Sequence, residues 1–367
     1  MTPTPGPTAT PGPEALEAPF SLEAPVSLDG RTGAGAQPVD AVDYAALERR
    51  HPAYGRFAAR LGNTPLTEVP GPDGGATVLA KCEWENPVGS IKDRVAYALL
   101  GSALHRHGDR PLEELRVLEY SGGNLAKALS HLCAELGVTA RFVLSSASPR
   151  SLLDVLAERG AQVDLVDKER GFLDVVRTAL DIAAADSGWT LLYQHRNTAN
   201  LLLQERTTGA EIVRQLGELP GAPRADAWVA SIGTGGTLVG VLRALRGAFP
   251  GVRAVGVTPE ELPYGSDRPP NGLPKYGGSG GMGHGIRQPF VTLHDDEIEH
   301  RTVSYPRALE GMAEFHDLTG VRIGSSAAAN WLTARAVAAT LPPSATVVTV
   351  LPDAGTPEEW ERIGRGE

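Results

Sequence analysis

Short apolar runs alternate with longer amphipathic segments from Thr64 onward. The apolar runs have the length of buried strands, and they cover residues 77–84, 116–120, 141–145, 161–166, 190–193, 227–232, 253–257 and 346–351. Between most of them lie segments of helical length, at 124–136, 149–159, 171–186, 200–216, 236–247 and 326–340. Alternation of strands and helices is typical of parallel sheets covered by helices, so the pattern predicts an α/β fold with open, mainly parallel sheets.

The stretch before residue 45 lacks this alternation. Its opening residues, MTPTPGPTATPGP, carry no charged side chain and no apolar periodicity, which predicts a flexible Pro/Gly-rich tail over 1–44. A chain of 367 residues has room for two domains at roughly 150 residues each. We therefore expect an N-terminal domain over 45–205 and a C-terminal domain over 206–367. A second glycine-rich segment, 265–285, is predicted to be a functional or flexible loop.

Composition narrows the classes of partner. The formal net charge is −10, from 44 acidic and 34 basic side chains, which argues against nucleic acid or an anionic membrane surface. Two cysteines cannot form a disulfide framework, so we expect a cytoplasmic protein. No apolar run reaches about 18 residues, the length that a membrane-spanning helix needs.

One of only five lysines lies in an unusual position. In the segment NPVGSIKDRVAYAL, residues 86–99, Ser90 and Asp93 have the spacing of a capping box that opens a helix. Lys92 then falls in the first helical turn, where the helix dipole disfavours a positive charge. A lowered amine pKa is what a nucleophilic lysine needs, although a lone lysine is more often exposed to water.

A glycine-rich segment follows the apolar run 227–232. Gly233, Thr234, Gly235, Gly236 and Thr237 stand where a strand is expected to turn into a helix, and backbone N–H groups at such a start bind anions. A dinucleotide fingerprint is excluded by Leu238, and the Gly-Lys-Ser/Thr ending of a P-loop is absent. The segment is therefore a candidate phosphate site for another ligand, or a structural turn.

Two further segments place small polar residues before predicted helices. They are SGGN at 121–124 and IGSSAAAN at 323–330. Ser and Asn cap many helices, so either segment alone is weak evidence for a binding site.

Together, and in this order, these segments resemble fold-type II pyridoxal-phosphate enzymes, most closely the cysteine synthase and cystathionine β-synthase family. The resemblance runs from NTPL (63–66) to LPDAG (351–355), with further matches in QHRNTAN (194–200) and TTGAEI (207–212). It implies two α/β domains, a homodimer and pyridoxal 5'-phosphate as cofactor. It assigns no residue to a metal.

The resemblance also implies roles for individual residues. Lys92 would form the Schiff base with pyridoxal phosphate and act as the catalytic residue, and Asn124 would contact the phenolic oxygen. The phosphate would be held by Gly233, Thr234, Gly235, Gly236 and Thr237. The substrate carboxylate would be bound by Ser121, Gly122, Gly123 and Gln194. Either Ser326 or Ser325 would meet the pyridine nitrogen.

Several positions depart from the family pattern. The substrate loop usually reads T-S-G-N-T, whereas this chain has Ser121-Gly122-Gly123-Asn124-Leu125. His195 and Arg196 stand where the family has an aromatic residue and a small polar one, and His284 and Arg287 lie in the loop that faces the substrate side chain. The four are candidate substrate-binding residues. Structural histidines and arginine ion pairs are the alternatives.

The resemblance predicts β-replacement on an activated serine-type amino acid. The reaction would pass through an aminoacrylate intermediate, to which a small nucleophile adds, giving a β-substituted alanine. The altered loops favour a specialised product such as 2,3-diaminopropionate. One alternative is β-elimination of the serine/threonine dehydratase or cysteine lyase type, releasing a keto acid and ammonia. A non-enzymatic alternative is a metabolite-sensing binding module.

Overall fold

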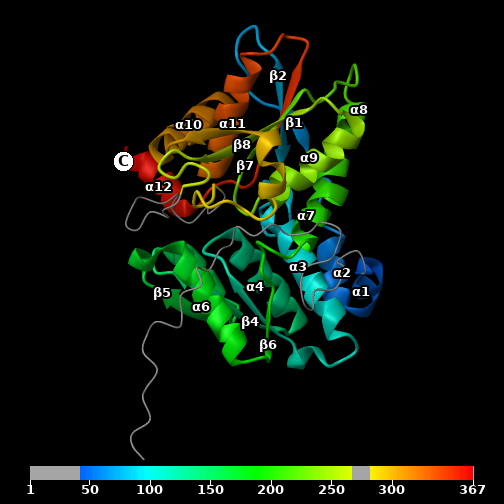
Figure 1. Cartoon of the computed structure of the whole chain (residues 1–367), viewed down its shortest axis with the longest axis vertical. Helices are drawn as coiled ribbons and strands as arrows, with labels where there is room; N and C mark the ends of the chain where they lie inside the picture. The colour runs from blue at the N-terminus through cyan, green and yellow to red at the C-terminus, as the bar shows by residue number, and fades with distance from the viewer. Residues whose placement is uncertain (1–41, 267–281, 367) are drawn as a thin grey trace, which may run out of the picture.

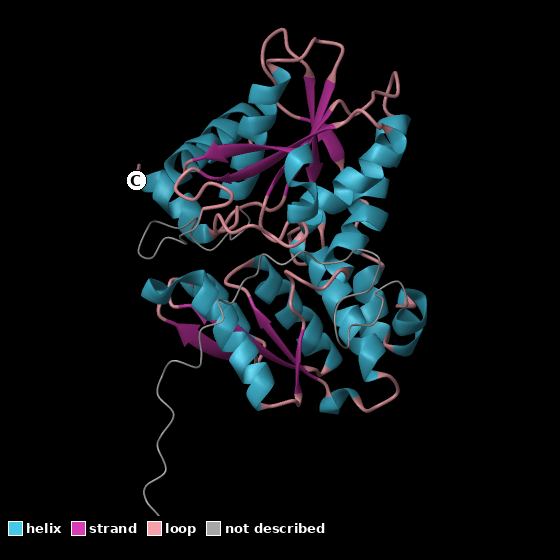
Figure 2. Cartoon of the chain, in the orientation of Figure 1, coloured by secondary structure: helices cyan, strands magenta, loops and turns pink. Residues whose placement is uncertain are grey.

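The computed structural model describes residues 42–266 and 282–366, which form two sheets with flanking helices (Figures 1 and 2). The predicted α/β fold with mainly parallel sheets is confirmed. Residues 1–41 of the predicted tail and 267–281 of the predicted loop lie outside the described residues. Within the described part of the chain, no helix is long and apolar enough to cross a membrane.

The larger sheet has six strands in the order β1-β2-β10-β7-β8-β9. Only β1 runs antiparallel to its neighbour. The strands are β1 (Leu66–Glu68), β2 (Thr77–Cys82), β7 (Ala227–Ser231), β8 (Arg253–Pro259), β9 (Ile298–Val303) and β10 (Thr346–Leu351). Its helices are α8 (Ala210–Glu218), α9 (Gly236–Ala248), α10 (Tyr305–Thr319), α11 (Ser325–Ala338) and α12 (Pro357–Arg365). Apolar residues of α10 and α11 fill a core on one face, and those of α8 and α9 fill the core on the other.

The smaller sheet has four parallel strands in the order β5-β4-β3-β6. They are β3 (Arg116–Tyr120), β4 (Thr139–Ser145), β5 (Gln162–Val166) and β6 (Trp189–Leu191). The helices of this half are α1 (Tyr44–Arg50), α2 (Pro52–Ala58), α3 (Lys92–His107), α4 (Asn124–Leu136), α5 (Arg150–Glu158), α6 (Gly171–Ala185) and α7 (Ala199–Gln204). Short 3-10 turns cover Glu83–Glu85, Leu112–Glu114, Lys168–Arg170 and Thr292–Glu297, and a π-helical turn, Glu205–Gly209, joins α7 to α8.

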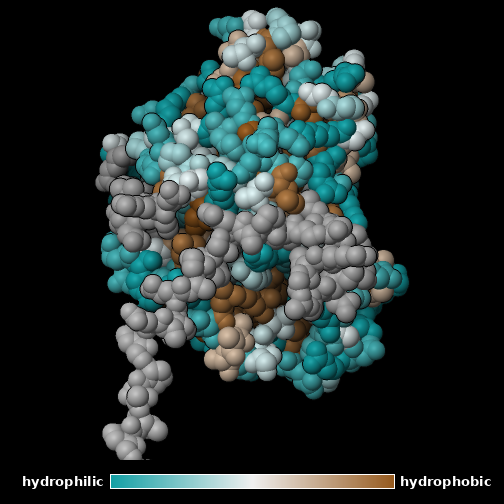
Figure 3. Space-filling view, viewed as in Figure 1, coloured by the Kyte–Doolittle hydropathy of each residue, from teal (hydrophilic) through white to brown (hydrophobic). Residues whose placement is uncertain are grey.

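Each apolar run that predicts a strand overlaps a strand in the structure. Strands β1 and β9 were not predicted. Strand β1 has only three residues, and β9, with the sequence IEHRTV, lies at the sheet edge with half-exposed and exposed positions. Neither shows the apolar pattern of a buried strand. Figure 3 shows hydrophilic residues over much of one face of the molecule, with hydrophobic residues in smaller patches.

The two sheets do not follow the predicted division at residues 205 and 206. Strands β1 and β2 belong to the six-stranded sheet, although they lie within the stretch 45–205. The reason is the parallel pairing of β2 with β10, in which Thr77 faces Thr346 and Cys82 faces Leu351. This pairing joins segments far apart in the sequence, and no local pattern indicates it.

The parallel strands bring several loops to the carboxyl edges of the sheets. Strand β7 leads into residues 233–237, β3 leads into 121–123, and β10 leads into Pro352 and Asp353. An isolated bridge between Ser90 and Asp353 ties the start of α3 to the end of β10. In open α/β sheets, ligands bind at these carboxyl ends.

Candidate functional site

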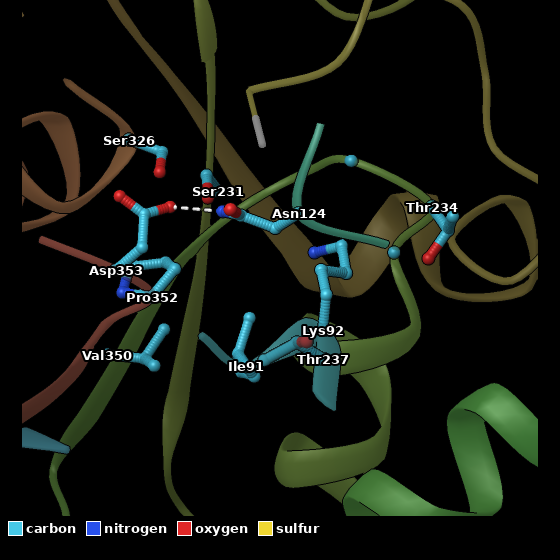
Figure 4. A pocket seen from close by; sticks show the side chains of 12 residues that line it. Ile91, Lys92, Asn124, Ser231, Thr234, Thr237, Ser326, Val350, Pro352 and Asp353 are labelled. Atoms are coloured by element: carbon cyan, nitrogen blue, oxygen red, sulfur yellow. Dashed lines mark hydrogen bonds between the residues drawn. The ribbon is translucent and has the colours of Figure 1, made fainter. Parts of the chain in front are cut away.

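A pocket gathers side chains from five segments far apart in the sequence (Figure 4). These segments are the start of α3, the start of α4, the loop from β7 to α9, the start of α11 and the end of β10. The pocket is lined by Ile91, Lys92, Asn124, Ser231, Gly233, Thr234, Gly235, Thr237, Ser326, Val350, Pro352 and Asp353. Seven of these are residues for which the family resemblance implies cofactor binding.

Lys92 is the first residue of α3 and lies in the pocket. Burial lowers the pKa of its amine, and the nearby Asp353 carboxyl opposes that shift. The local reason for its position differs from the predicted capping box. Ile91 is the N-cap residue and gives no side-chain cap, while Ser90 Oγ accepts the backbone N–H of Lys92 at 3.2 Å. A lowered pKa makes the neutral amine, which can act as a nucleophile or a base, easier to reach.

Asp93 also departs from the capping-box arrangement. Its carboxyl accepts the backbone N–H groups of Val88 and Gly89, so it stabilises the turn before the helix. Burial raises the pKa of this carboxyl to about 6, against the effect of those two hydrogen bonds. Asp93 therefore holds the loop that delivers Lys92 to the pocket.

The segment 233–237 forms the turn before α9. Gly235 is the N-cap residue, with a φ of 83° that favours glycine. A Cβ on Gly236 would lie 2.6 Å from Asn200 Oδ1, so glycine is also required there for space. Thr234 Oγ1 accepts a hydrogen bond from Asn200 Nδ2 at 3.0 Å, which fixes the loop to α7. The loop thus presents the start of a 13-residue helix to the pocket, where a phosphate group is favoured.

The two serines at the start of α11 have different surroundings. Ser326 Oγ lines the pocket and is buried, and it has no hydrogen-bond partner among the described residues. Ser325 is also buried, but its hydroxyl is engaged with the Glu359 carboxyl. Buried hydroxyls are normally hydrogen-bonded, and a ligand bound in this pocket can supply the partner. Ser326 is therefore the serine of the two that faces the pocket.

The residues predicted for the substrate carboxylate lie beside the pocket and are absent from its lining. Ser121, Gly122 and Gly123 form the loop between β3 and α4. A Cβ on Gly122 would lie 2.8 Å from Ser148 Oγ, so the glycine allows close approach of the loops. Gln194 Nε2 donates to the backbone carbonyl of Tyr120 at 2.7 Å, directly before this loop.

His195 and His284 belong to one aromatic cluster, which we define as Tyr120, Phe172, Tyr193, His195 and His284. His195 Nδ1 is 2.8 Å from the Tyr120 hydroxyl oxygen, and the two rings stack. His284 stacks on Phe172 with ring centroids 4.2 Å apart. Burial, the His284 ring and the Lys92 amine lower the pKa of His195 to about 3. His195 is thus neutral at neutral pH, which excludes it as a cationic anion-binding group.

The two predicted arginines lie in other surroundings. Arg287 is half exposed and forms an ion pair with Asp295, with 3.4 Å between Nη1 and Oδ2. Arg196 lies close enough to Tyr193 to lower the pKa of that hydroxyl, against the larger effect of burial, which raises it. Neither arginine is part of the pocket lining.

Four residues of this region were not predicted from the sequence. Asp353 and Ser231 line the pocket, Asn200 holds Thr234, and Tyr120 contacts His195. Asp353 lies inside the motif LPDAG and Asn200 inside QHRNTAN. Their position within segments that match the family could have indicated that they belong to the site. Among the residues that the structure describes, no three His, Cys, Asp or Glu side chains gather in a way that could hold a metal ion.

Known proteins resemble this chain over most of its length. The family of pyridoxal-phosphate dependent enzymes matches residues 58–353. Cysteine synthase B of Salmonella typhimurium is 31% identical over 300 residues, covering 80% of this chain and 91% of that protein. A cysteine synthase of Staphylococcus aureus is 29% identical over 297 residues, covering 80% of this chain and 92% of that protein. A crystal structure of O-ureido-L-serine synthase with O-ureido-L-serine bound has a TM-score of 0.74 and 25% identity, covering 84% of this chain and 93% of that one.

The chain therefore belongs to the pyridoxal-phosphate-dependent enzymes, in the fold-type II group of cysteine synthases and cystathionine β-synthases. The predicted family, enzyme class and cofactor are confirmed. The pocket fits this cofactor in three respects. It holds a lysine amine, a helix start that suits a phosphate, and the orphaned Ser326 hydroxyl. When bound, pyridoxal phosphate supplies an electron-withdrawing ring that stabilises negative charge on the Cα of an amino acid.

Proposed function

We propose that this enzyme carries out β-replacement on an activated serine derivative and so makes a β-substituted alanine. The observation that carries the proposal is the Lys92 amine, which has a lowered pKa and shares one pocket with the Thr234 loop and Ser326. β-Replacement needs a base for the Cα proton and a site that stabilises the resulting charge. The similarity to cysteine synthases and to O-ureido-L-serine synthase supports the same reaction class.

Each residue of the pocket has a distinct part in the proposal. Lys92 would hold the cofactor covalently and, once released, move the Cα proton. The loop 233–237 would bind the cofactor phosphate, Asn124 its phenolic oxygen and Ser326 its pyridine nitrogen. A neutral serine hydroxyl withdraws less charge from the ring than a carboxylic acid would. This setting favours loss of a β-leaving group over transamination.

The substrate side supports a specialised reactant. The substrate carboxylate would bind at Ser121, Gly122, Gly123 and Gln194. Leu125 cannot donate a hydrogen bond, so fewer donors are available than in the family's T-S-G-N-T loop. The aromatic cluster adds a neutral imidazole beside this loop. We infer a β-substituent or nucleophile that is recognised by hydrogen bonding and stacking, such as a carbamoyl-type group or an amine, as in 2,3-diaminopropionate formation.

The first test is the link between Lys92 and the cofactor. Purified enzyme should absorb at about 410 nm after reconstitution with pyridoxal phosphate, as a lysine-bound cofactor does. Lys92→Ala should lose this band. Lys168→Ala is the matched control, since that lysine is 60% exposed and should keep the band. A band that survives in Lys92→Ala would contradict the assignment.

The second test identifies the reaction. O-Acetylserine, O-phosphoserine, serine, threonine and cysteine would each be incubated with and without sulfide or a small amine, and the products read by mass spectrometry. A β-substituted alanine that appears only with a nucleophile supports β-replacement. Rapid keto-acid and ammonia release at the same rate without a nucleophile would overturn it in favour of β-elimination.

We further propose that the enzyme is a cytoplasmic homodimer. Sedimentation of the purified enzyme would test the oligomeric state.

A further inference from the structure

Asp353 connects the segments that carry the main residues of the pocket. It follows β10, lines the pocket and is 6% exposed. Its backbone carbonyl accepts the N–H of Gly324, the residue before α11, at 3.0 Å. Its backbone also bridges to Ser90, two residues before Lys92. The Asp353 backbone is therefore held by the segments that carry Ser326 and Lys92.

The Asp353 carboxyl is a hydrogen-bond acceptor at both oxygens. Oδ2 accepts from Asn124 Nδ2 at 2.8 Å (Figure 4), and Oδ1 accepts from the backbone N–H of Gly355 at 2.9 Å. Burial raises the pKa of this carboxyl, while those two hydrogen bonds and the amines of Lys92 and Lys127 act in the opposite direction. The Asp353 carboxyl is also close enough to Glu359 to raise the pKa of the Glu359 carboxyl.

This arrangement determines which end of the Asn124 amide faces Asp353. An amide side chain has a donating nitrogen and an accepting oxygen, and rotation by half a turn exchanges them. Both oxygens of the Asp353 carboxyl accept N–H groups, so this carboxyl presents an acceptor to Asn124 and selects its nitrogen. The same nitrogen carries a second N–H, and Figure 4 shows the Asn124 side chain between Asp353 and Lys92.

We propose that Asp353 is a positioning residue of the cofactor pocket, which orients Asn124 so that the amide offers its second N–H to the phenolic oxygen of pyridoxal phosphate. That oxygen carries negative charge in the bound cofactor and needs a donor. An Asn124 amide turned the other way would present an oxygen to it and repel it. The inference rests on the proposed contact between Asn124 and the cofactor.

The test is a double-mutant cycle on cofactor affinity, measured by absorbance titration of the apo-enzyme with pyridoxal phosphate. Asp353→Asn keeps the shape of the side chain but can donate to Asn124 Oδ1, which stabilises the reversed amide. We expect Asp353→Asn to raise the Kd about tenfold, the usual scale for losing one hydrogen bond to a charged group. In an Asn124→Ala background, the same substitution should change the Kd less than twofold.

Asp226→Asn is the matched control. Asp226 lies at the opposite end of β10, where its carboxyl accepts the backbone N–H of Thr346 at 2.8 Å, so this variant also removes a carboxylate at a strand end. It should keep the wild-type Kd. Thermal unfolding of each apo-enzyme shows how much stability each substitution costs, independently of binding.

Two results would overturn the role of Asp353, and both can be distinguished from a result that contradicts the proposed cofactor contact of Asn124. If Asp353→Asn raises the Kd equally in the wild-type and Asn124→Ala backgrounds, Asp353 acts on the pocket without Asn124. If Asn124→Ala raises the Kd and Asp353→Asn does not, the orientation of the amide is independent of Asp353. If Asn124→Ala itself leaves the Kd unchanged, the proposed contact of Asn124 with the cofactor is wrong.

Discussion

Tyr120 and His195, which are 75 positions apart in the sequence, lie with the Tyr120 hydroxyl 2.8 Å from His195 Nδ1 and with their rings stacked. Tyr120 ends β3 directly before the substrate loop, and His195 follows Gln194, whose side chain also binds the Tyr120 backbone. The pair therefore joins two segments of the proposed substrate site. It also places a histidine in an environment where a positive charge is costly.

This environment predicts a pH dependence of stability. Because the pKa of His195 is lowered to about 3 in the folded protein, the unfolded chain binds an extra proton between pH 3 and about 6.5. The free energy of unfolding therefore has its full His195 contribution above about pH 6.5. As the pH falls toward 3, protonation of the unfolded chain lowers this free energy by up to about 5 kcal/mol. We expect His195→Phe to flatten the dependence of the free energy of unfolding on pH between 4 and 7, as measured by urea denaturation.

The exposed His105 provides the comparison for this measurement. His105→Phe should leave the slope at its wild-type value. A His195→Phe variant whose free energy of unfolding falls as steeply in acid as that of the wild type would show that other groups carry the effect.

The orphaned hydroxyl at the start of α11 predicts a difference between two adjacent serines. Ser326→Ala removes the hydroxyl that faces the pocket, so we expect weaker cofactor binding by about tenfold and a shifted absorption band of the bound cofactor. Ser325→Ala removes the hydroxyl engaged with Glu359 and should lower thermal stability with a smaller change in Kd. The opposite ranking of the two Kd values would assign the pyridine contact to Ser325.

The turn at Gly235 predicts a strong effect of a single methyl group. Gly235→Ala forces a residue with a side chain into a φ of 83° and brings its Cβ against Val291. We expect the affinity for pyridoxal phosphate to fall at least about tenfold, because the backbone N–H groups move away from the phosphate. Gly247→Ala in the same helix has open space around the new methyl and should bind the cofactor as the wild type does. Equal affinities for the two variants would contradict a phosphate site at this turn.

A buried ion network near Lys92 predicts a large effect on stability. Arg94 is 1% exposed and pairs with Glu83 and Glu211, at 2.7 Å in each case. Arg94→Met would leave two carboxylates without this partner, so the free energy of unfolding should fall by about 3–5 kcal/mol. The exposed pair of Arg214 and Glu218 is the control, where Arg214→Met should cost less than about 1 kcal/mol. Chemical denaturation measures the free energy of unfolding of both variants. Equal decreases would contradict the expectation that the buried ion pairs matter more to stability than the exposed pair.

Much of the fold was predictable because its signals are local. The apolar runs that predict β2, β3, β7 and β10 are each recognisable within a few residues, since a buried parallel strand needs continuous apolar side chains. The same holds for Gly235 in the segment 233–237, where a φ of 83° favours glycine. Lys92 was recognisable because its position conflicts with the usual preferences of a helix start.

The remaining features depend on contacts between distant segments. The partition of the strands between the sheets follows from the pairing of β2 with β10, which a local pattern cannot indicate. Only the folded chain brings Asp353 to Asn124, gives Ser326 an unpartnered hydroxyl while Ser325 is engaged, and places His195 against Tyr120. The sequence by itself thus determined the family, the cofactor, the glycine-rich turn and the lysine at the helix start. The tertiary structure decided their hydrogen-bond partners and pKa shifts, because burial and distance are properties of the packed molecule.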